Sequence, residues 1–341
     1  MTSRPQVTVI TPIHNEEEGL EDYYRSVSEM LISRDDCDYR VLFVDDGSSD
    51  RSWAIIQDIC GRSPRFQALR LSRNFGSHAA ISAGIDHAAG DAVATLACDL
   101  QDPPSVVLEF VEKWRGGAQV VWGHRRSRAD RGWQAAASRV FFHLVRRYAM
   151  PRGSKFTTGS FLLVDCAVVE ALRQFRELNR ITFALVAWTG FNQDVVEYDR
   201  LARTRGVTGW TFGRKLKAMY DTFIGFSELP ARMITITGVA MWVFSLLLGA
   251  YLLADYLLQS VMPGWTGIML ALTVFFGLLF LILGVVGEYL HRIYVEVTQR
   301  PIYLVSGRAG FSAAEASETS RRPVYLVSGR AGAAGFDATG R

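Results

Sequence analysis

Cysteine is scarce in this chain and widely spaced. The 341 residues include four cysteines, none in a Cys-x-x-Cys pair: Cys37, Cys60, Cys98 and Cys166. This spacing argues against a zinc site and against a disulfide framework. A reducing compartment is therefore the expected environment.

An excess of charge of one sign is also missing. Lys and Arg together number 37 and Asp and Glu 34, which leaves a net charge of +3. Because a nucleic-acid-binding protein would show a clear basic excess, no nucleic acid is expected as a partner. The N-terminus lacks the features of a signal peptide, since its apolar run at 7–13 is too short and is typical of a strand.

Strands alternate with helices over the first 200 residues. Strands are predicted at 7–13, 40–44, 66–71, 91–97 and 119–123, and later ones near 157–164 and 195–200. Helices are expected to open at 14–18 and near 51, and to run from 76 to 89 and over 181–191, with Asp165 capping another. This alternation predicts a mainly parallel sheet with helices on both faces.

The Gly-x-Gly-x-x-Gly motif of a dinucleotide-binding fold is absent after the first strand. Polar residues follow three of the predicted strands instead: Asn15 and Glu16, Asp45 and Asp46, and Asp99 to Asp102. Right-handed crossovers would bring these strand ends to one rim, where open α/β sheets bind ligands. The pattern favours carboxylates that recognise a base and ribose, and a metal that binds a diphosphate.

The stretch Thr95-Leu-Ala-Cys-Asp-Leu-Gln-Asp-Pro-Pro104 lies at the centre of this arrangement. The strand ends in the side-chain oxygens of Asp99, Gln101 and Asp102, and two prolines then turn the chain into a helix. Such oxygens suit Mg²⁺ or Mn²⁺. The alternative is a solvated Asp-Pro turn that caps the helix.

Two basic segments follow the fifth predicted strand. Gly123-His-Arg-Arg-Ser-Arg128 is either a solvated run of charge or an anion site at the rim of the sheet. The segment 138–150 places aromatic and aliphatic residues on one face and arginines between them. It is either a helix that faces the core or one that lies on an anionic membrane surface.

The C-terminal third has a different pattern. An amphipathic segment over 215–224 is predicted to lie at a membrane interface. The runs 234–254 and 265–287 carry no charge, and at about 1.5 Å per residue each covers roughly 30 Å. They predict a transmembrane hairpin in an inner membrane. Lys and Arg flank its outer ends and are missing from the connector, which places both termini in the cytoplasm.

The domain limits follow from these patterns. A cytoplasmic catalytic domain is predicted over 1–212, an interfacial region over 213–232, the hairpin over 233–290 and a cytoplasmic tail over 291–341.

The tail repeats itself, since Arg300-Pro-Ile-Tyr-Leu-Val-Ser-Gly-Arg-Ala-Gly310 returns at 322–332 with one substitution, Val for Ile. The simpler interpretation is a duplicated and largely disordered end. The alternative is that 302–305 adds an edge strand to the catalytic domain.

Taken together, these motifs resemble the family 2 glycosyltransferases, most closely the branch of bactoprenol glucosyltransferases and dolichyl-phosphate mannose synthases. The motifs are Thr11-Pro-Ile-His-Asn-Glu16, Val44-Asp-Asp-Gly-Ser-Ser-Asp50, Ser72-Arg-Asn-Phe-Gly76, Asp99-Leu-Gln-Asp-Pro-Pro104, Tyr198-Asp-Arg200 and Phe226-Ser-Glu-Leu-Pro230. Each is weak alone, whereas the ordered set with the hairpin, from Val7 to Val305, is specific. The resemblance implies a GT-A domain, a nucleotide-sugar donor, a divalent metal and a lipid-phosphate acceptor.

The resemblance also implies roles for individual residues. Nucleotide-binding positions are matched by Pro12, Glu16, Asp45, Asp46 and Arg73. Metal-ligand positions are matched by Asp99 and Gln101, and Asp102 is a further catalytic candidate. Acceptor or phosphate positions are matched by Arg125, Ser160, Arg200 and Arg203. Three positions depart from the pattern, because the family often has Asp at 97 and 160 and Lys at 209, where this chain has Ala97, Ser160 and Gly209.

The function implied is inverting transfer of a sugar, from UDP-glucose or another UDP-hexose, to a polyprenyl phosphate of the undecaprenyl type. GDP-mannose is the alternative donor. A processive polysaccharide synthase would carry more membrane helices and a Gln-x-x-Arg-Trp motif, and the sequence shows neither. A transporter would carry charges within its spans, and the two predicted spans have none. A membrane-anchored scaffold that binds nucleotide sugar without turnover would fit the three departures. The sequence leaves open whether the chain forms a homo-oligomer, as no Gly-x-x-x-Gly motif occurs in the hairpin.

Overall fold

The computed structural model describes residues 4–126, 161–175, 182–201, 264–298 and 300–312, and positions 240, 243, 244 and 247. The chain divides into two compact units, one made of 1–138, 151–211 and 301–341 and the other of 139–150 and 212–300. Several predictions fall outside the described residues. These are the helix over 138–150, the amphipathic segment at 215–224, the motif at 226–230, all but four positions of the first predicted span (234–254), the second copy of the repeat, and residues Ser160, Arg203 and Gly209.

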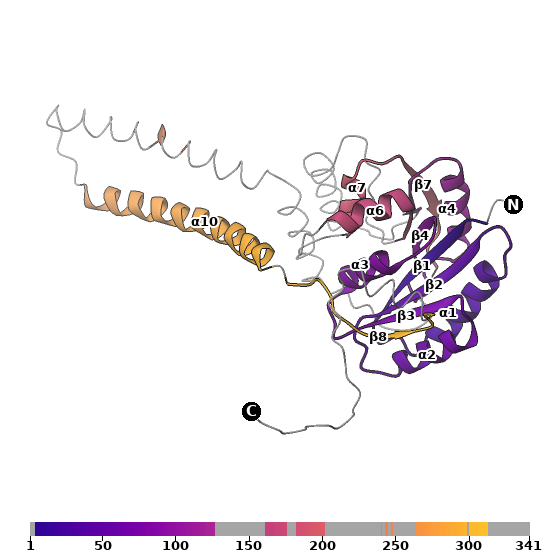
Figure 1. Ribbon diagram of the computed structural model, residues 1–341. Coiled ribbons are helices and arrows are strands. Elements are labelled where there is room, and N and C mark those ends of the chain that lie inside the picture. The colour runs from indigo at the N-terminus through magenta and orange to yellow at the C-terminus, as the bar shows by residue number, and fades with distance from the viewer. Residues whose placement is uncertain are drawn as a thin grey trace, which may run out of the picture. The chain divides into compact units, whose positions relative to one another are not determined.

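An eight-stranded mixed sheet forms the centre of the first unit (Figure 1). Its strands are β1 (Gln6–Ile13), β2 (Asp38–Asp45), β3 (Phe66–Leu71), β4 (Ala92–Thr95), β5 (Val120–Arg125), β6 (Leu162–Asp165), β7 (Gln193–Tyr198) and β8 (Val305–Ala309). Their order is β7-β5-β6-β4-β1-β2-β3-β8. Four of the seven pairings are parallel (β1 with β2, β1 with β4, β2 with β3, β5 with β7), which confirms the mainly parallel sheet.

Helices cover both faces of the sheet. On one face lie α1 (Leu20–Val27), the π-helix η1 (Ser28–Ile32), α2 (Ser52–Arg62) and α4 (Val106–Arg115), which share one hydrophobic core with alternate residues of the strands. On the other face lie α3 (Ser77–His87), α6 (Cys166–Gln174) and α7 (Thr182–Trp188) (Figure 1). The central strands are mostly apolar and largely buried, because helices cover both of their faces.

Close packing of α3 on β1 depends on one glycine. A Cβ atom added at Gly84 of α3 would lie 2.4 Å from the Cγ2 atom of Ile10 in β1. The helix therefore approaches the strand at a distance that a larger residue would not permit. Asp165 caps α6 as the sequence predicted, because its Oδ1 accepts a hydrogen bond from the Ala167 N–H at 2.9 Å.

The first helix begins later than the sequence predicted. The segment 14–18 was expected to open it, but α1 starts at Leu20. The N–H groups of Asn15, Glu16 and Glu17 donate instead to side chains between β2 and the start of α2: Ser48 Oγ at 3.0 Å, Ser52 Oγ at 3.0 Å and Asp50 Oδ2 at 3.2 Å. These long-range bonds hold the segment in an irregular loop.

The first copy of the repeated segment belongs to the sheet. β8 pairs antiparallel with the edge strand β3, and Val305 is 1% exposed. Ser72 N–H donates to the Leu304 carbonyl at 2.8 Å, and the Tyr303 hydroxyl donates to Asp86 Oδ2 at 2.9 Å. The edge-strand alternative is therefore confirmed, with the strand at 305–309 and not at 302–305. The simpler interpretation, a disordered end, is wrong for this copy.

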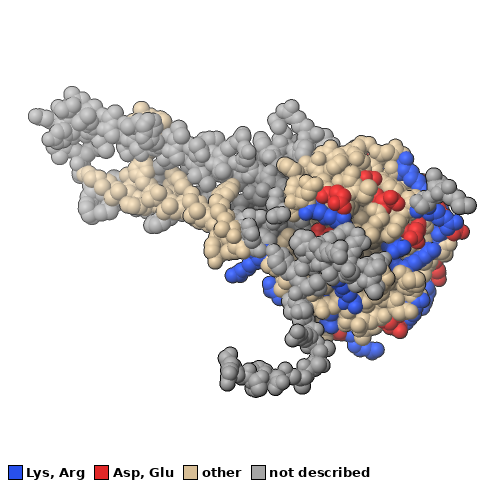
Figure 2. Space-filling model, in the orientation of Figure 1, with Lys and Arg blue, Asp and Glu red and all other residues tan. Residues whose placement is uncertain are grey.

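The second unit contains α10 (Trp265–Val297), a helix of 33 residues that includes the second predicted span. Its apolar side chains form an exposed stripe at intervals of three and four residues: Ile268, Leu272, Phe276, Leu279, Leu283, Val286, Leu290, Ile293 and Val297. Figure 2 shows the described surface of α10 nearly without charge, whereas Lys, Arg, Asp and Glu are mixed over the first unit. No helix within the described parts of the chain has both the length and the apolar character needed to cross a membrane.

Gly310 provides a test of the β8 assignment, with a matched control in the second copy. Its φ is +77°, and an added Cβ atom would lie 2.4 Å from the Phe66 carbonyl oxygen. We expect Gly310→Ala to lower the free energy of unfolding by about 2 kcal/mol or more, because it strains the backbone and displaces β8. The same change at the equivalent Gly332 should stay within about 0.5 kcal/mol.

The two variants would be compared by chemical denaturation of the purified full-length protein. Equal effects at Gly310 and Gly332 would contradict the assignment. Truncation gives an independent check, since removal of residues 321–341 should leave stability and activity intact, whereas removal of 300–341 should reduce both.

His78 at the start of α3 predicts a dependence of stability on pH. Its ring lies 5.4 Å from that of Phe183, and its Nδ1 atom has no hydrogen-bond partner among the described residues. Burial lowers the pKa of His78 to about 4. Since the unfolded chain binds the proton with an ordinary pKa near 6.5, stability is complete above that pH and falls as the pH drops towards 4.

Between pH 7 and pH 5 this linkage should remove about 2 kcal/mol from the free energy of unfolding. We expect His78→Gln to lack this component, as measured by urea unfolding at both pH values. The matched change at the exposed His124 should retain it. The same pH dependence in His78→Gln and the parent protein would contradict the prediction.

Candidate active site

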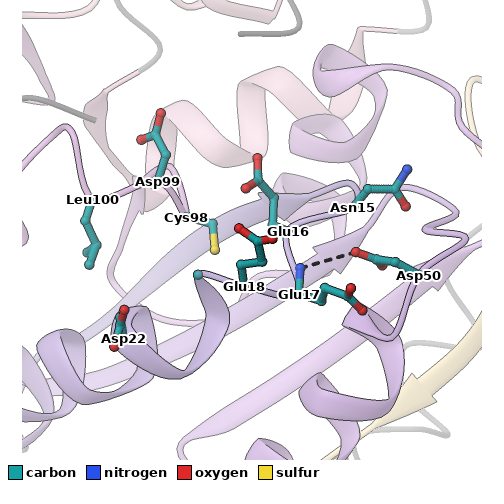
Figure 3. Close-up of a pocket in the computed structure, with 10 residues that line it drawn as sticks. Asn15, Glu16, Glu17, Glu18, Asp22, Asp50, Cys98, Asp99 and Leu100 are labelled. Atoms are coloured by element: carbon teal, nitrogen blue, oxygen red, sulfur yellow. Dashed lines mark hydrogen bonds between the residues drawn. The ribbon is translucent and has the colours of Figure 1, made fainter. Parts of the chain in front are cut away.

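A pocket with an acidic lining lies between the loops that follow β1, β2 and β4. It has a volume of about 240 Å³, and its lining comprises Asn15, Glu16, Glu17, Glu18, Gly19, Asp22, Asp50, Cys98, Asp99 and Leu100. Figure 3 shows Glu16 and Asp99 extending from two different loops on the same side of this pocket. The structure thus brings together two of the residues that the sequence predicted for nucleotide and metal binding.

Strained backbone occurs at this pocket. Asn15 (φ 55°) and Leu100 (φ 51°) are the non-glycine residues with positive φ in the described part of the chain, and both line the pocket. The left-handed conformation costs a non-glycine residue roughly 1–2 kcal/mol. Such strain persists where the surrounding structure fixes it, and it is concentrated at functional sites. Leu100 stands between Asp99, which lines the pocket, and Asp102, which does not.

Asp45 and Asp46 at the end of β2 are engaged by protein groups. Asp45 is fully buried, accepts the Ser48 N–H at 3.0 Å and lies 3.3 Å from Arg70 Nε. The Arg70 backbone carbonyl in turn accepts a hydrogen bond from the Ser306 hydroxyl of β8, at 3.3 Å. These contacts connect the added edge strand with the loops around the pocket.

Asp46 fixes the neighbouring Ser72–Gly76 loop. Its two oxygens accept the N–H groups of Phe75 at 2.7 Å and Gly76 at 2.8 Å. His14 adds a second attachment, because its Nδ1–H donates to the Asp46 carbonyl at 2.9 Å and its Nε2 lies 2.9 Å from Asn74 Nδ2. Burial raises the pKa of Asp46, and the two backbone N–H groups oppose that shift.

Gly47 allows the two loops to touch. Its φ is +65°, and an added Cβ atom would lie 2.4 Å from the backbone carbonyl carbon of Arg73. Arg73, a predicted nucleotide-binding residue, is exposed on this loop, and its guanidinium lies 4.5 Å from the ring centroid of Phe75. Pro12, another predicted residue, lies in β1 opposite Val44 of β2.

Asp99 and Gln101, the predicted metal ligands, lie on the irregular segment after β4. Asp99 Oδ1 accepts the Gln101 N–H at 3.2 Å, and the Gln101 carbonyl accepts the Leu201 N–H at 2.9 Å. In the described residues no three His, Cys, Asp or Glu side chains form a group able to hold a metal ion. The side-chain oxygens of Asp99 and Gln101 still fit a cation such as Mg²⁺, which proteins commonly hold by one or two carboxylates together with substrate phosphates and water.

Asp102 faces a different set of residues. It is 2% exposed, and its Oδ1 accepts a hydrogen bond of 2.6 Å from the Tyr198 hydroxyl. Arg125 Nη2 lies 3.7 Å and Arg200 Nε 3.8 Å from the same oxygen. Arg125 Nε also donates to the Tyr198 hydroxyl at 3.3 Å. Burial, followed by the Asp102 charge, raises the pKa of Tyr198 well above its ordinary value.

Sequence reasoning missed two kinds of residue at this site. Tyr198 was part of a quoted motif, but its hydrogen bond to Asp102 was not foreseen. His14 and Asn74, which hold the loop after β3, were also missed. Their motifs were visible in the sequence, whereas pairings across 60 and 96 residues were not.

Comparisons with known proteins agree with this architecture. The family model described as glycosyl transferase family 2 matches residues 8–173. An uncharacterized glycosyltransferase of Synechocystis is 35% identical over 88% of this chain and 95% of its own length. The SfII prophage-derived bactoprenol glucosyl transferase of Shigella flexneri is 31% identical over 88% of this chain and 97% of its own.

Mannosyl-3-phosphoglycerate synthase from Rubrobacter xylanophilus is among the similar solved structures, at 16% identity over 69% of this chain and 75% of that one, with a TM-score of 0.46.

The chain belongs to glycosyl transferase family 2 and is a glycosyltransferase, and its sheet is mixed and covered by helices on both faces. Within that family it is related to bactoprenol glucosyl transferases over most of its length, as its motifs predicted.

The contacts of Asp46 lead to a prediction for the Ser72–Gly76 loop. Asp46→Ala leaves the N–H groups of Phe75 and Gly76 without their carboxylate acceptor. We expect the free energy of unfolding to fall by about 2 kcal/mol, because charged hydrogen bonds at a nearly buried site are lost. Urea denaturation would measure the change.

Asp58→Ala is the matched control, since its carboxylate is exposed on α2 and pairs only with Arg62 among the described residues. This control should change stability by less than about 0.5 kcal/mol. An equally small effect in Asp46→Ala would show that the loop does not depend on the carboxylate.

Proposed function

We propose that this glycosyltransferase transfers a sugar from a nucleotide sugar, UDP-glucose or another UDP-hexose, to a polyprenyl phosphate at a membrane surface, with inversion at the anomeric carbon. The observation that carries the proposal is the division of one loop between two sites of opposite charge. Asp99 lines the acidic pocket with Glu16, whereas Asp102, three residues later, faces Arg125 and Arg200.

The acidic side of this loop suits the donor. Nucleoside diphosphates bind proteins commonly through a divalent cation, and Asp99 and Gln101 are the residues that would hold Mg²⁺ or Mn²⁺. When bound, such a cation neutralises the charge that develops on the departing diphosphate. Asp102 is not available as a substitute ligand for the missing Asp at 97, because its carboxylate is committed to Tyr198 and the arginines.

The basic side suits an anionic acceptor. Arg125 is the last residue of β5, and Arg200 follows the end of the neighbouring parallel strand β7; their side chains are 27% and 37% exposed. Guanidinium groups bind phosphate oxygens through paired N–H donors. The relatives of this chain include bactoprenol glucosyl transferases, whose names specify a polyprenol.

The chemistry requires positioning more than proton abstraction. A phosphate monoester has a second pKa of about 6, so its oxygen is already a nucleophilic anion near neutral pH. That oxygen forms a bond to the anomeric carbon as the bond from this carbon to the diphosphate oxygen breaks, and the electron pair leaves with the nucleoside diphosphate. Alignment of the two reactants by the two sides of the loop lowers the barrier, and no covalent enzyme intermediate forms.

Membrane attachment at the cytoplasmic face is part of the proposal. It is supported by the uncharged runs at 234–254 and 265–287 and by the exposed apolar stripe of α10. A prenyl chain is insoluble in water, so an enzyme that acts on its phosphate needs contact with the lipid phase.

The purified protein would be tested in detergent with undecaprenyl phosphate and Mg²⁺ or Mn²⁺ against a panel of UDP- and GDP-sugars. Release of nucleoside diphosphate that needs both lipid and metal, with the glycolipid confirmed by mass, would establish the reaction and identify the donor. Donor binding without turnover would contradict the proposal and favour a binding scaffold. If GDP-mannose alone supports turnover, the donor is GDP-mannose and not a UDP-sugar.

Asp99→Ala tests the donor side. We expect this variant to lose turnover by about 100-fold or more and to lose the metal-dependent part of its affinity for UDP, because the main protein ligand is gone. Calorimetric titration of UDP with and without Mn²⁺ measures the second effect independently of turnover. Asp22→Ala, which removes another carboxylate from the same pocket, should retain the metal dependence. Unchanged metal-dependent binding in Asp99→Ala would overturn the assignment.

A further inference from the structure

Asp102 holds together the end of the site that would bind the acceptor phosphate. A carboxylate with 2% exposure needs strong partners in order to stay ionised. Among the described residues, three groups approach its Oδ1 atom: the Tyr198 hydroxyl at 2.6 Å, Arg125 Nη2 at 3.7 Å and Arg200 Nε at 3.8 Å. The two arginines come from segments about 75 residues apart, and one oxygen brings them to the same place.

The distances show that Asp102 neutralises the arginines without occupying them. A separation of 3.7–3.8 Å exceeds hydrogen-bond length, so the ion pairs with Asp102 do not use up guanidinium N–H donors. Each guanidinium carries five such donors. Two cations near one another repel unless a negative charge lies between them. The buried carboxylate therefore allows the two arginines to lie close together, and neither ion pair with it uses a guanidinium N–H donor.

The backbone around Asp102 makes this arrangement rigid. Leu201 N–H donates to the Gln101 carbonyl at 2.9 Å, and Arg126 N–H donates to the Tyr198 carbonyl at 3.0 Å. The segment that bears Asp99 and Asp102 is thus bonded to the segment that bears Tyr198 and Arg200. A change in the position of one segment is transmitted to the other.

We infer that Asp102 is a positioning residue: held by Tyr198, its carboxylate sets Arg125 and Arg200 at the spacing that binds one phosphate monoester of the acceptor. The inference rests on the proposed function and assigns Asp102 to the acceptor side and not to the metal. It separates the roles of two aspartates three residues apart.

Steady-state kinetics with undecaprenyl phosphate and the active donor would test this role. Asp102→Asn keeps the shape and removes the charge, so we expect the KM for the lipid phosphate to rise about tenfold, the equivalent of about 1.4 kcal/mol. The KM for the donor should not change and kcat should fall by less than about threefold, because donor contacts are intact. Tyr198→Phe, which loses only the hydroxyl, should show the same pattern at about threefold.

A double-mutant cycle distinguishes positioning from a general loss of structure. In an Arg125→Ala background, Asp102→Asn should raise the lipid KM by less than about twofold more, because the residue acts through that arginine. Asp194→Asn is the matched control, since this carboxylate lies at the opposite end of β7 and pairs with Lys113 at 2.8 Å. It should leave both KM values unchanged.

The outcomes separate this inference from the proposed function. Lipid-dependent turnover by the parent protein, with an unchanged lipid KM in both Asp102→Asn and Tyr198→Phe, would overturn the inference alone. Loss of metal-dependent UDP binding in Asp102→Asn would place the residue at the donor and would also overturn it. No turnover by the parent protein with any donor would overturn the proposed function, and the inference with it.

Discussion

The parallel pairing of β1 with both β2 and β4 is the constraint on which the site depends. Ile13 lies opposite Asp45, and Ile10 lies opposite Thr95, so these strands end close to one another. Their loops must then share a small space at the carboxyl rim of the sheet. Backbone N–H groups in that space donate hydrogen bonds to side chains of the neighbouring loop. The polar residues there therefore serve largely to hold the loops together.

A consequence is that two carboxylates expected to bind ligand also build the site. Asp46 fixes the loop after β3 through two backbone bonds, and Asp102 gathers Tyr198 and two arginines. Desolvation makes such groups expensive unless every oxygen is well partnered. Once partnered, they are rigid, and rigidity is what a transfer reaction between two bound substrates requires.

The added strand β8 connects the C-terminal part of the chain to the same region. It follows α10 in the sequence, pairs with β3, and lies beside Arg70, which approaches the buried Asp45. A segment that comes after the proposed membrane attachment therefore supports a loop of the acidic pocket. The local reason is the edge of β3, whose backbone groups need a partner strand.

The sequence by itself determined the strands, because continuous apolar runs are required where helices cover both faces, and β3 at 66–71 was predicted to the residue. It also determined the family, through six short motifs in a fixed order. Only the tertiary structure decided which residues of those motifs lie at the acidic pocket and which lie beside the arginines. Asp99 lines the acidic pocket and Asp102 faces the arginines, with Leu100 in a left-handed conformation between them. Periodicity cannot reveal this division, since it depends on contacts with Tyr198 and Leu201, about 100 residues further along the chain.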